Sequence, residues 1–190
     1  PSEIPGFEDR PYDALFCGTI NERKGADFFG EVLKRCKAKG RTVSARIIGH
    51  GPLQEDLEKS LAEAGIPARF DGYLQAEDLP AAYGSAKLFL FPSRSDPWGL
   101  VANEAILCGT PVIGSPHAVS SVELVGPYEA GLVLPLDAEA WSNAVIETLD
   151  SKERWRELQA NHARACGSFS VERAVAAFRD ILETIDEPPT

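Results

Sequence analysis

Short apolar runs alternate with stretches of helical periodicity along the whole chain, and this alternation limits the fold more than any other feature of the sequence. The apolar runs predicted as strands cover residues 14–17, 43–48, 68–70, 88–91, 111–113 and 131–134. The stretches predicted as helices cover residues 25–39, 52–65, 79–83, 100–108, 138–149, 152–165 and 171–185. Strands that alternate with helices of this length form βαβ units, in which the strands pair in parallel. The sequence therefore predicts an α/β fold with a mainly parallel sheet.

The predicted strand at residues 88–91 is apolar at every position, which is typical of a strand that helices cover on both faces. A length of 190 residues fits one domain. We therefore expect residues 1–190 to form a single Rossmann-like, doubly wound domain with about six parallel strands, helices on both faces and a helical tail over about 138–185. Residues 1–11 and 186–190 are expected to be tail-like. Such sheets bind ligands at the carboxyl ends of their strands, so functional residues are expected in the loops that follow the strands.

The charge and the cysteines exclude several classes of function. The chain carries 29 Asp and Glu against 19 Lys and Arg, a net charge of −10, whereas nucleic-acid binding needs clustered cations. No apolar run reaches the roughly 18 residues that span a membrane, and the N-terminus lacks the features of a signal peptide. The four cysteines form no metal-binding cluster, and Cys17 and Cys108 are expected to be small core residues. We expect a cytoplasmic protein with free thiols, no metal, no nucleic-acid partner and no integral membrane segment.

The loop after the first predicted strand, residues 18–25, joins a strand to a helix and carries two adjacent cations, Arg23 and Lys24. A phosphate group at this place would meet Lys24, Arg23 and the amides of the helix N-terminus. The loop matches neither the GxGxxG fingerprint nor the Walker loop. A solvated basic turn explains the same residues, so the loop alone leaves both interpretations open.

Two glycines flank His50 in the loop after the second predicted strand. Gly49 and Gly51 would allow a ligand to approach the backbone closely. A tight turn before a helix that begins near Pro52 explains the glycines as well. His50 by itself predicts no more than an exposed side chain.

The segment after the fourth predicted strand places two carboxylates eight residues apart, Asp96 in a loop and Glu104 within an apolar helix. The amides near Gly99, Leu100 and Val101 and the helix dipole favour an anion. A partly buried Glu104 needs hydrogen-bond partners, which two vicinal ribose hydroxyls would supply, and Asp96 would bind hydroxyls of a second sugar. The alternative makes Asp96 a helix cap and Glu104 an exposed helix residue.

This segment resembles the acid-x7-acid segment of retaining glycosyltransferase family four, on the residues Asp96-Pro97-Trp98-Gly99-Leu100, Glu104-Ala105 and Gly109-Thr110-Pro111-Val112-Ile113. Members of that family have the two-domain GT-B architecture. The other pieces of the resemblance follow in the family's order: residues 16–18 with Lys24-Gly25, 47–53, 70–74 with Leu79 and Tyr83, Glu123, 131–133 and 169–170. The resemblance covers about residues 14–185 and implies the C-terminal, donor-binding half of a GT-B enzyme.

The resemblance implies a nucleotide-sugar donor, UDP-sugar or GDP-sugar, and no separate cofactor. Glu104 would hold the ribose hydroxyls, Asp96 the hydroxyls of the donor sugar, and Lys24 the diphosphate. The backbone around Tyr73 and Leu74 would frame the base. Lys24 and Asp96 are the residues expected to act in catalysis, because negative charge develops on the departing diphosphate. The donor-binding set that the resemblance implies is Gly18, Arg23, Lys24, Gly49, Gly51, Tyr73, Leu74, Asp96, Gly99, Leu100, Val101 and Glu104.

The sequence departs from the family's pattern at three places. Asp96 stands where the family usually has Glu, and Thr19 stands where it usually has Arg. Val119-Ser120 stands in place of paired glycines, which narrows the approach to the sugar. His117 lies near this last loop in the sequence without an assigned role. These departures leave the identity of the donor sugar open.

The acceptor site of a GT-B enzyme lies on a separate N-terminal domain, and the first strand of this chain is expected near Tyr12. We therefore expect a missing N-terminal acceptor domain or subunit, through which any contact with the inner membrane would be made. The leading hypothesis is a donor-binding domain that transfers a hexose to a saccharide or lipid-linked acceptor and is inactive as an isolated chain. The alternatives are a degenerate, non-catalytic GT-B module with an interaction or regulatory role, and another GT-B enzyme such as a sugar-nucleotide epimerase or a phosphorylase.

Overall fold

The computed structural model describes residues 4–168, so the predicted helix over residues 171–185 and the Phe169-Ser170 pair lie outside the described part. The strands are β1 (Tyr12–Cys17), β2 (Ala45–Ile48), β3 (Ala68–Gly72), β4 (Ala86–Phe91), β5 (Val112–Gly114) and β6 (Gly131–Val133). The helices are α1 (Ala26–Ala38), α2 (Gln54–Glu63), α3 (Leu79–Gly84), α4 (Leu100–Leu107), α5 (Ala138–Asp150), α6 (Lys152–Ala160) and α7 (His162–Ser168), with a π-helix, η1, at Ser121–Val125.

The six strands of the described chain form one parallel sheet in the order β3-β2-β1-β4-β5-β6. The chain runs outward from β1 to β3 and then returns to β4 on the other side of β1. The strand order therefore reverses between β1 and β4, whose carboxyl ends flank the crevice where such sheets bind ligands. The predicted Rossmann-like, doubly wound sheet is confirmed.

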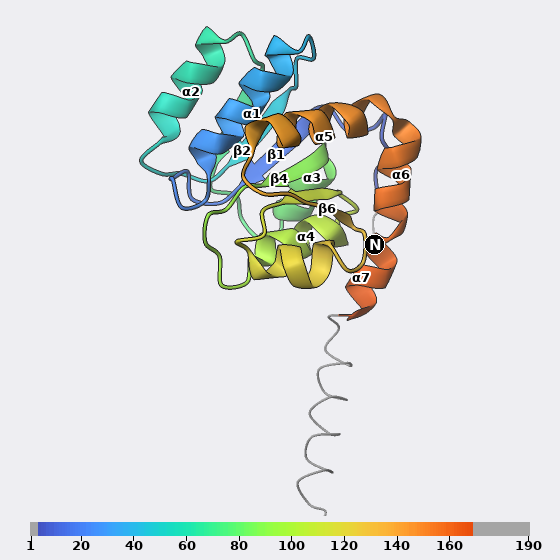
Figure 1. Ribbon diagram of the computed structural model, residues 1–190. Coiled ribbons are helices and arrows are strands. Elements are labelled where there is room, and N and C mark those ends of the chain that lie inside the picture. Colours follow the sequence, from blue (N-terminus) through green and yellow to red (C-terminus); the bar gives the residue numbers. More distant parts are fainter. Residues whose placement is uncertain (1–3, 169–190) are drawn as a thin grey trace, which may run out of the picture.

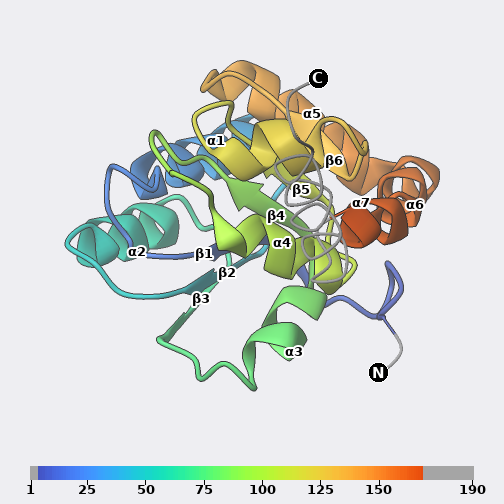
Figure 2. The same cartoon turned by 90° about the horizontal axis from the view of Figure 1, so that it is seen from below.

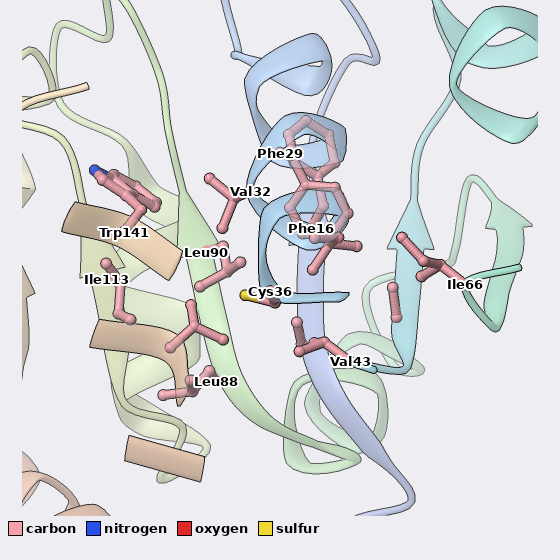
Figure 3. Close-up of a cluster of buried hydrophobic side chains, with 14 of the residues drawn as sticks. Phe16, Phe29, Val32, Cys36, Val43, Ile66, Leu88, Leu90, Ile113 and Trp141 are labelled. Atoms are coloured by element: carbon pink, nitrogen blue, oxygen red, sulfur yellow. The ribbon is translucent and has the colours of Figure 1, made fainter. Parts of the chain in front are cut away.

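Helices α1, α2 and α5 cover one face of the sheet, and α3, α4 and η1 cover the other (Figures 1 and 2). Successive side chains of a strand point to opposite faces, so each face of the sheet has its own hydrophobic core. Phe16 and Leu88 enter the first core, under α1, α2 and α5, whereas Leu15 and Phe89 enter the second core, under α3, α4 and η1. The first core contains Phe29 of α1, which packs against Phe16 at a ring-centroid distance of 5.5 Å (Figure 3). Burial on both faces explains why β1 and β4 are apolar at nearly every position.

The sequence predicts a tail over residues 1–11, but the described part of this segment, residues 4–11, packs against the domain. Phe7 is buried, and the Arg10 guanidinium is 2% exposed. Arg10 donates to the carbonyl of Ala86 at 2.7 Å and to the carbonyl of Gly109 at 2.9 Å, and it lies over the ring of Trp155. Burial lowers the pKa of Arg10 to about 10. Five fixed N–H donors can satisfy several carbonyls at once, so this residue joins the segment to the body of the domain.

Three further details differ from the predictions. The predicted helix over 152–165 is divided into α6 and α7 at Asn161, whose side chain donates to the carbonyls of Glu129 and Glu157, both at 3.2 Å. Cys17 and Cys108 are half-buried at the rim of the second core rather than core residues. The π-helix η1 has no counterpart among the predicted elements. Within residues 4–168, no helix has both the length and the apolar character to cross a bilayer.

Candidate functional site

Three loops meet at the carboxyl edge of the sheet, after β1, β4 and β5, and hydrogen bonds join them. Arg23 Nη1 in the first loop donates to the carbonyl of Ser95 in the second at 2.9 Å. The amide of Asp96 donates to the carbonyl of His117 in the third loop at 3.1 Å, and the amide of Val119 returns a bond to the carbonyl of Asp96 at 3.3 Å. The loops that the sequence singles out therefore form one continuous surface at the point where the strand order reverses.

Lys24 and Asp96 form an ion pair across the first two loops. Their side chains are 18% and 9% exposed, so the pair is largely shielded from water. The amide of Lys24 donates to Asn21 Oδ1 at 2.9 Å, which fixes the backbone beneath the ammonium group. Lys24 is thus no solvated turn residue, whereas Arg23 is exposed. The interpretation of Asp96 as a helix cap is wrong, because Gly99 is the N-cap of α4 and no side chain caps that helix.

The N-terminus of α4 opens onto the same edge. Gly99 adopts φ 92° there, and a Cβ atom at this position would lie 2.6 Å from the ring of Phe91 and 2.9 Å from Ser120 Oγ. The structure therefore requires glycine for backbone conformation and packing. The first amides of the helix, at Leu100 and Val101, follow directly, and the Leu100 side chain is 67% exposed. Amides at a helix N-terminus attract anions.

Glu104 is half-buried on α4, and its partner comes from α3. The hydroxyl of Tyr83 donates to Glu104 Oε2 at 2.7 Å, and Tyr83 itself has no exposed surface. Burial raises the pKa of Tyr83 far above its ordinary value, so the hydroxyl keeps its proton and remains a donor. The interpretation of Glu104 as a plain exposed helix residue is wrong. Sequence reasoning missed the partner, because helical periodicity and the family resemblance single out Tyr83 without indicating that its hydroxyl reaches Glu104.

The glycines of the loop after β2 have a packing role. A Cβ at Gly49 would lie 2.0 Å from the carbonyl oxygen of Gly18, and one at Gly51 would lie 2.3 Å from that of Ile20. The amide of Ile20 in turn donates to the carbonyl of His50 at 3.0 Å. The two loops after β1 and β2 therefore touch through their backbones, which supports the tight-turn interpretation. Whether a ligand also approaches here stays a prediction.

Two aromatic rings, those of His50 and Tyr73, lie at the carboxyl ends of β2 and β3. Tyr73 is 72% exposed and meets the exposed His50 ring edge to face at a centroid distance of 5.1 Å. His50 Nδ1 lies 2.9 Å from Gln54 Oε1. Leu74 packs against the second core and holds the backbone that follows Tyr73. The residues predicted to frame the base, Tyr73 and Leu74, thus follow β3, whereas Lys24 lies in the loop after β1. Both places are at the carboxyl ends of the strands.

Val119 and Ser120, which stand in place of the family's paired glycines, help to join the loops after β4 and β5. Ser120 is fully buried; its amide donates to the carbonyl of Trp98 at 2.8 Å and its Oγ to the carbonyl of Gly99 at 3.0 Å. Val119, beside it, is 41% exposed at the same edge. The side chain of His117 is exposed, and only its carbonyl takes part in the contact with Asp96 described above. Within the described residues, no group of three His, Cys, Asp or Glu side chains could hold a metal ion.

Comparison with known proteins identifies the family to which this chain belongs. Residues 2–165 match the family model described as glycosyl transferases group 1, and the chain belongs to that family. It is 30% identical over 162 residues to an alpha-D-kanosaminyltransferase of Streptomyces kanamyceticus, a match that covers 83% of this chain and 41% of the relative. It is 33% identical over 150 residues to O-antigen chain mannosyltransferase B of Escherichia coli, covering 76% of this chain and 38% of the relative.

Solved structures agree on the fold. The pneumococcal O-GlcNAc transferase GtfA, solved in complex with UDP and GlcNAc, superposes with a TM-score of 0.79 at 16% identity, over 97% of this chain and 38% of that one. The fold is that of one half of a GT-B glycosyltransferase, as the resemblance predicts. The chain therefore spans about two fifths of the length of the proteins it matches.

Proposed function

We propose that this chain is the donor-binding domain of a retaining glycosyltransferase of family four. It binds a UDP-hexose or GDP-hexose, and the hexose passes to a saccharide or lipid-linked acceptor held by an N-terminal domain or subunit. The observation that carries the proposal is the meeting of Lys24, the N-terminus of α4 and Glu104 at the point where the strand order reverses. We place the activity in the cytoplasm, with any membrane contact made through the rest of the protein.

The proposed chemistry breaks the bond between the anomeric carbon of the hexose and the diphosphate, while the acceptor's hydroxyl oxygen bonds that carbon and its proton passes to the departing diphosphate. Negative charge then grows on the departing diphosphate, where the Lys24 ammonium and the amides of Leu100 and Val101 stabilise it. Asp96, once Lys24 turns to the diphosphate, accepts from hydroxyls of the sugar. Glu104 accepts from the two ribose hydroxyls, and the ring of Tyr73 lies near the base. The charge is balanced by protein groups alone, so the proposal includes no metal.

Calorimetric titration of the 190-residue chain with UDP, GDP, UDP-hexoses and GDP-hexoses tests the proposal. We expect binding of one nucleotide series, and a loss of at least about tenfold in affinity in Lys24→Ala and in Glu104→Ala, because each removes a charged hydrogen-bonding group. Lys34→Ala is the matched control, since Lys34 contacts Ser60 away from the strand ends. A chain that binds none of these nucleotides contradicts the proposal.

A non-catalytic module is the second candidate function. It is favoured by the Lys24–Asp96 ion pair, which leaves Lys24 already neutralised, and by Val119-Ser120 in place of paired glycines. The two candidates differ when the chain is joined to an N-terminal acceptor domain. We expect sugar transfer by that longer protein and none by the isolated chain. Nucleotide binding without transfer in the longer protein supports the module instead.

A further inference from the structure

Two buried hydrogen bonds join Arg10, Thr110 and the backbone of Tyr83, and a third, part-buried one joins the Tyr83 side chain to Glu104. Arg10 Nη1 donates to Thr110 Oγ1 at 2.7 Å, and Thr110 Oγ1 donates to the carbonyl of Tyr83 at 2.9 Å. The Tyr83 hydroxyl then donates to Glu104 Oε2 at 2.7 Å. Arg10, Thr110 and Tyr83 are each 2% exposed or less. The N-terminal segment, the turn before β5, α3 and α4 are thus linked through side chains that water does not reach.

Tyr83 is held both through its ring and through its backbone. Its ring packs edge to face on Phe89 of β4 at a centroid distance of 5.6 Å. Its backbone is held by Thr110. A side chain fixed in this way presents its hydroxyl in one place only. The position of that hydroxyl therefore decides where the carboxylate of Glu104 points.

The chemistry of the partner matters as much as its position. Tyrosine is uncharged, so the contact with Oε2 orients the carboxylate without cancelling its negative charge. Among the described residues, Tyr83 makes a hydrogen bond to Oε2 of the Glu104 carboxylate, and Oε1 is left to accept from a ligand. A free glutamate side chain samples several rotamers, and restricting it before the ligand arrives lowers the entropy lost on binding.

We infer that Tyr83 is a positioning residue, whose buried hydroxyl holds Glu104 in the orientation that receives the vicinal hydroxyls of the donor's ribose. This inference rests on the proposed function and deepens it. Tyr83 touches no part of the donor; it acts through Glu104. Its contribution is therefore largest for ligands that carry both ribose hydroxyls, and it is smaller for a 2′-deoxyribose analogue, which keeps only the 3′ hydroxyl.

The test measures the affinity ratio of UDP to 2′-deoxy-UDP, or of the guanine pair if the chain binds GDP, by calorimetry. Tyr83→Phe keeps the ring and removes only the hydroxyl. We expect it to weaken UDP binding about five- to tenfold and 2′-deoxy-UDP binding by less, because the analogue has one hydroxyl fewer for Glu104. Glu104→Gln should reduce the ratio in the same way, and the double variant should lose no more than Glu104→Gln. Tyr128→Phe, the same change at a half-buried tyrosine on the second core, should leave the ratio at its wild-type value.

Each outcome decides a separate point. A wild-type chain that binds neither nucleotide contradicts the proposed function and this inference with it. A wild-type chain that prefers UDP, together with a Tyr83→Phe variant of unchanged preference, leaves the donor site standing and overturns the role of Tyr83. Equal weakening of UDP and 2′-deoxy-UDP in Tyr83→Phe also overturns it, because a general loss of packing does not distinguish the two sugars. Thermal unfolding of each variant verifies that it is folded in the titration.

Discussion

The two carboxylates of the acid-x7-acid segment are eight residues apart and have opposite surroundings. Asp96 lies in a loop and pairs with a cation, Lys24. Glu104 lies on α4 and accepts from a neutral hydroxyl, that of Tyr83. The first contact cancels charge and occupies the cation, whereas the second keeps the negative charge and fixes its direction. Two carboxylates that look alike in the sequence thus have different partners in the structure.

This difference predicts opposite behaviour when a nucleotide diphosphate arrives. The diphosphate must compete with Asp96 for Lys24, so that contact has to open. The ribose hydroxyls approach a carboxylate that already has its orientation, so the Tyr83 contact has no need to open. Four changes to the protein break or sharpen this comparison, beginning with the largest expected effect.

Arg10→Met should disturb the contacts that support Tyr83, the partner of Glu104, and leave the Lys24–Asp96 ion pair intact. It removes the guanidinium that holds Thr110, and it leaves the carbonyls of Ala86 and Gly109 without their donor. We expect the free energy of unfolding to fall by about 3–5 kcal/mol in urea denaturation. Arg35→Met, at an exposed ion pair with Glu139, is the control and should stay near the wild-type value. Similar losses in both variants would contradict a special role for the buried arginine.

Gly99→Ala should disturb the tightly packed N-cap of α4, which lies between Asp96 and Glu104 in the sequence. The added Cβ would lie 2.6 Å from the ring of Phe91 at a φ of 92°. We expect a loss of about 2–4 kcal/mol in unfolding free energy, because strain and overlap add. Gly40→Ala separates the two causes: Gly40 has φ 90° and nothing within 4 Å, so it should lose only about 1 kcal/mol. Equal losses at the two glycines would show that overlap with Phe91 is unimportant.

The stability of the fold should depend on pH through His162, a buried side chain whose partner is a neutral backbone carbonyl. His162 lies against the carbonyl of Ala130, and burial lowers the pKa of His162 to about 4. The unfolded chain has the ordinary pKa near 6.5 and binds the proton first, so stability is full above pH 6.5 and falls as the pH approaches 4. Between pH 6.5 and 5 we expect a loss of about 2 kcal/mol, followed by urea denaturation. The loss should be absent in His162→Gln, and an unchanged slope in that variant would contradict the assignment.

Asp96→Asn tests whether Asp96 competes with the diphosphate for Lys24. It frees Lys24 and removes a negative charge beside the diphosphate, so UDP or GDP should bind about three- to tenfold more tightly. The nucleotide sugar should gain less, because the proposed sugar contact is weakened at the same time. Asp27→Asn is the matched control, since Asp27 pairs with Arg94 and not with Lys24. Weaker binding of the free nucleotide in Asp96→Asn would contradict competition for Lys24.

Much of the fold could be predicted from local patterns. The alternation of apolar runs and helical stretches predicts six parallel strands, and the structure confirms them. The division between α6 and α7 could not be predicted, because it falls at Asn161, whose side chain bonds the distant carbonyl of Glu129. The loops that carry Lys24 and Asp96 could be located, since the strand ends of a parallel sheet meet at one edge.

The partners of the site residues were harder to predict. Lys24 and Asp96 are 72 residues apart, and nothing in the sequence shows that they form an ion pair. Tyr83 and Glu104 lie on two helices of the same face, where a helical pattern identifies Tyr83 only as a buried residue. Arg10 lies in a segment rich in Pro, Gly and charge, which is typical of a tail, yet its donors reach carbonyls 76 and 99 residues away.

By itself, the sequence determined the class of fold, and it predicted the strand ends at which a ligand would bind and the residues whose chemistry suits a phosphate or a sugar hydroxyl. These follow from periodicity and side-chain chemistry, which are local properties. Only the tertiary structure decided which carboxylate meets a cation and which meets a neutral hydroxyl. That choice depends on distant segments packing side by side, where burial removes water and leaves each polar group with the partner that the fold provides.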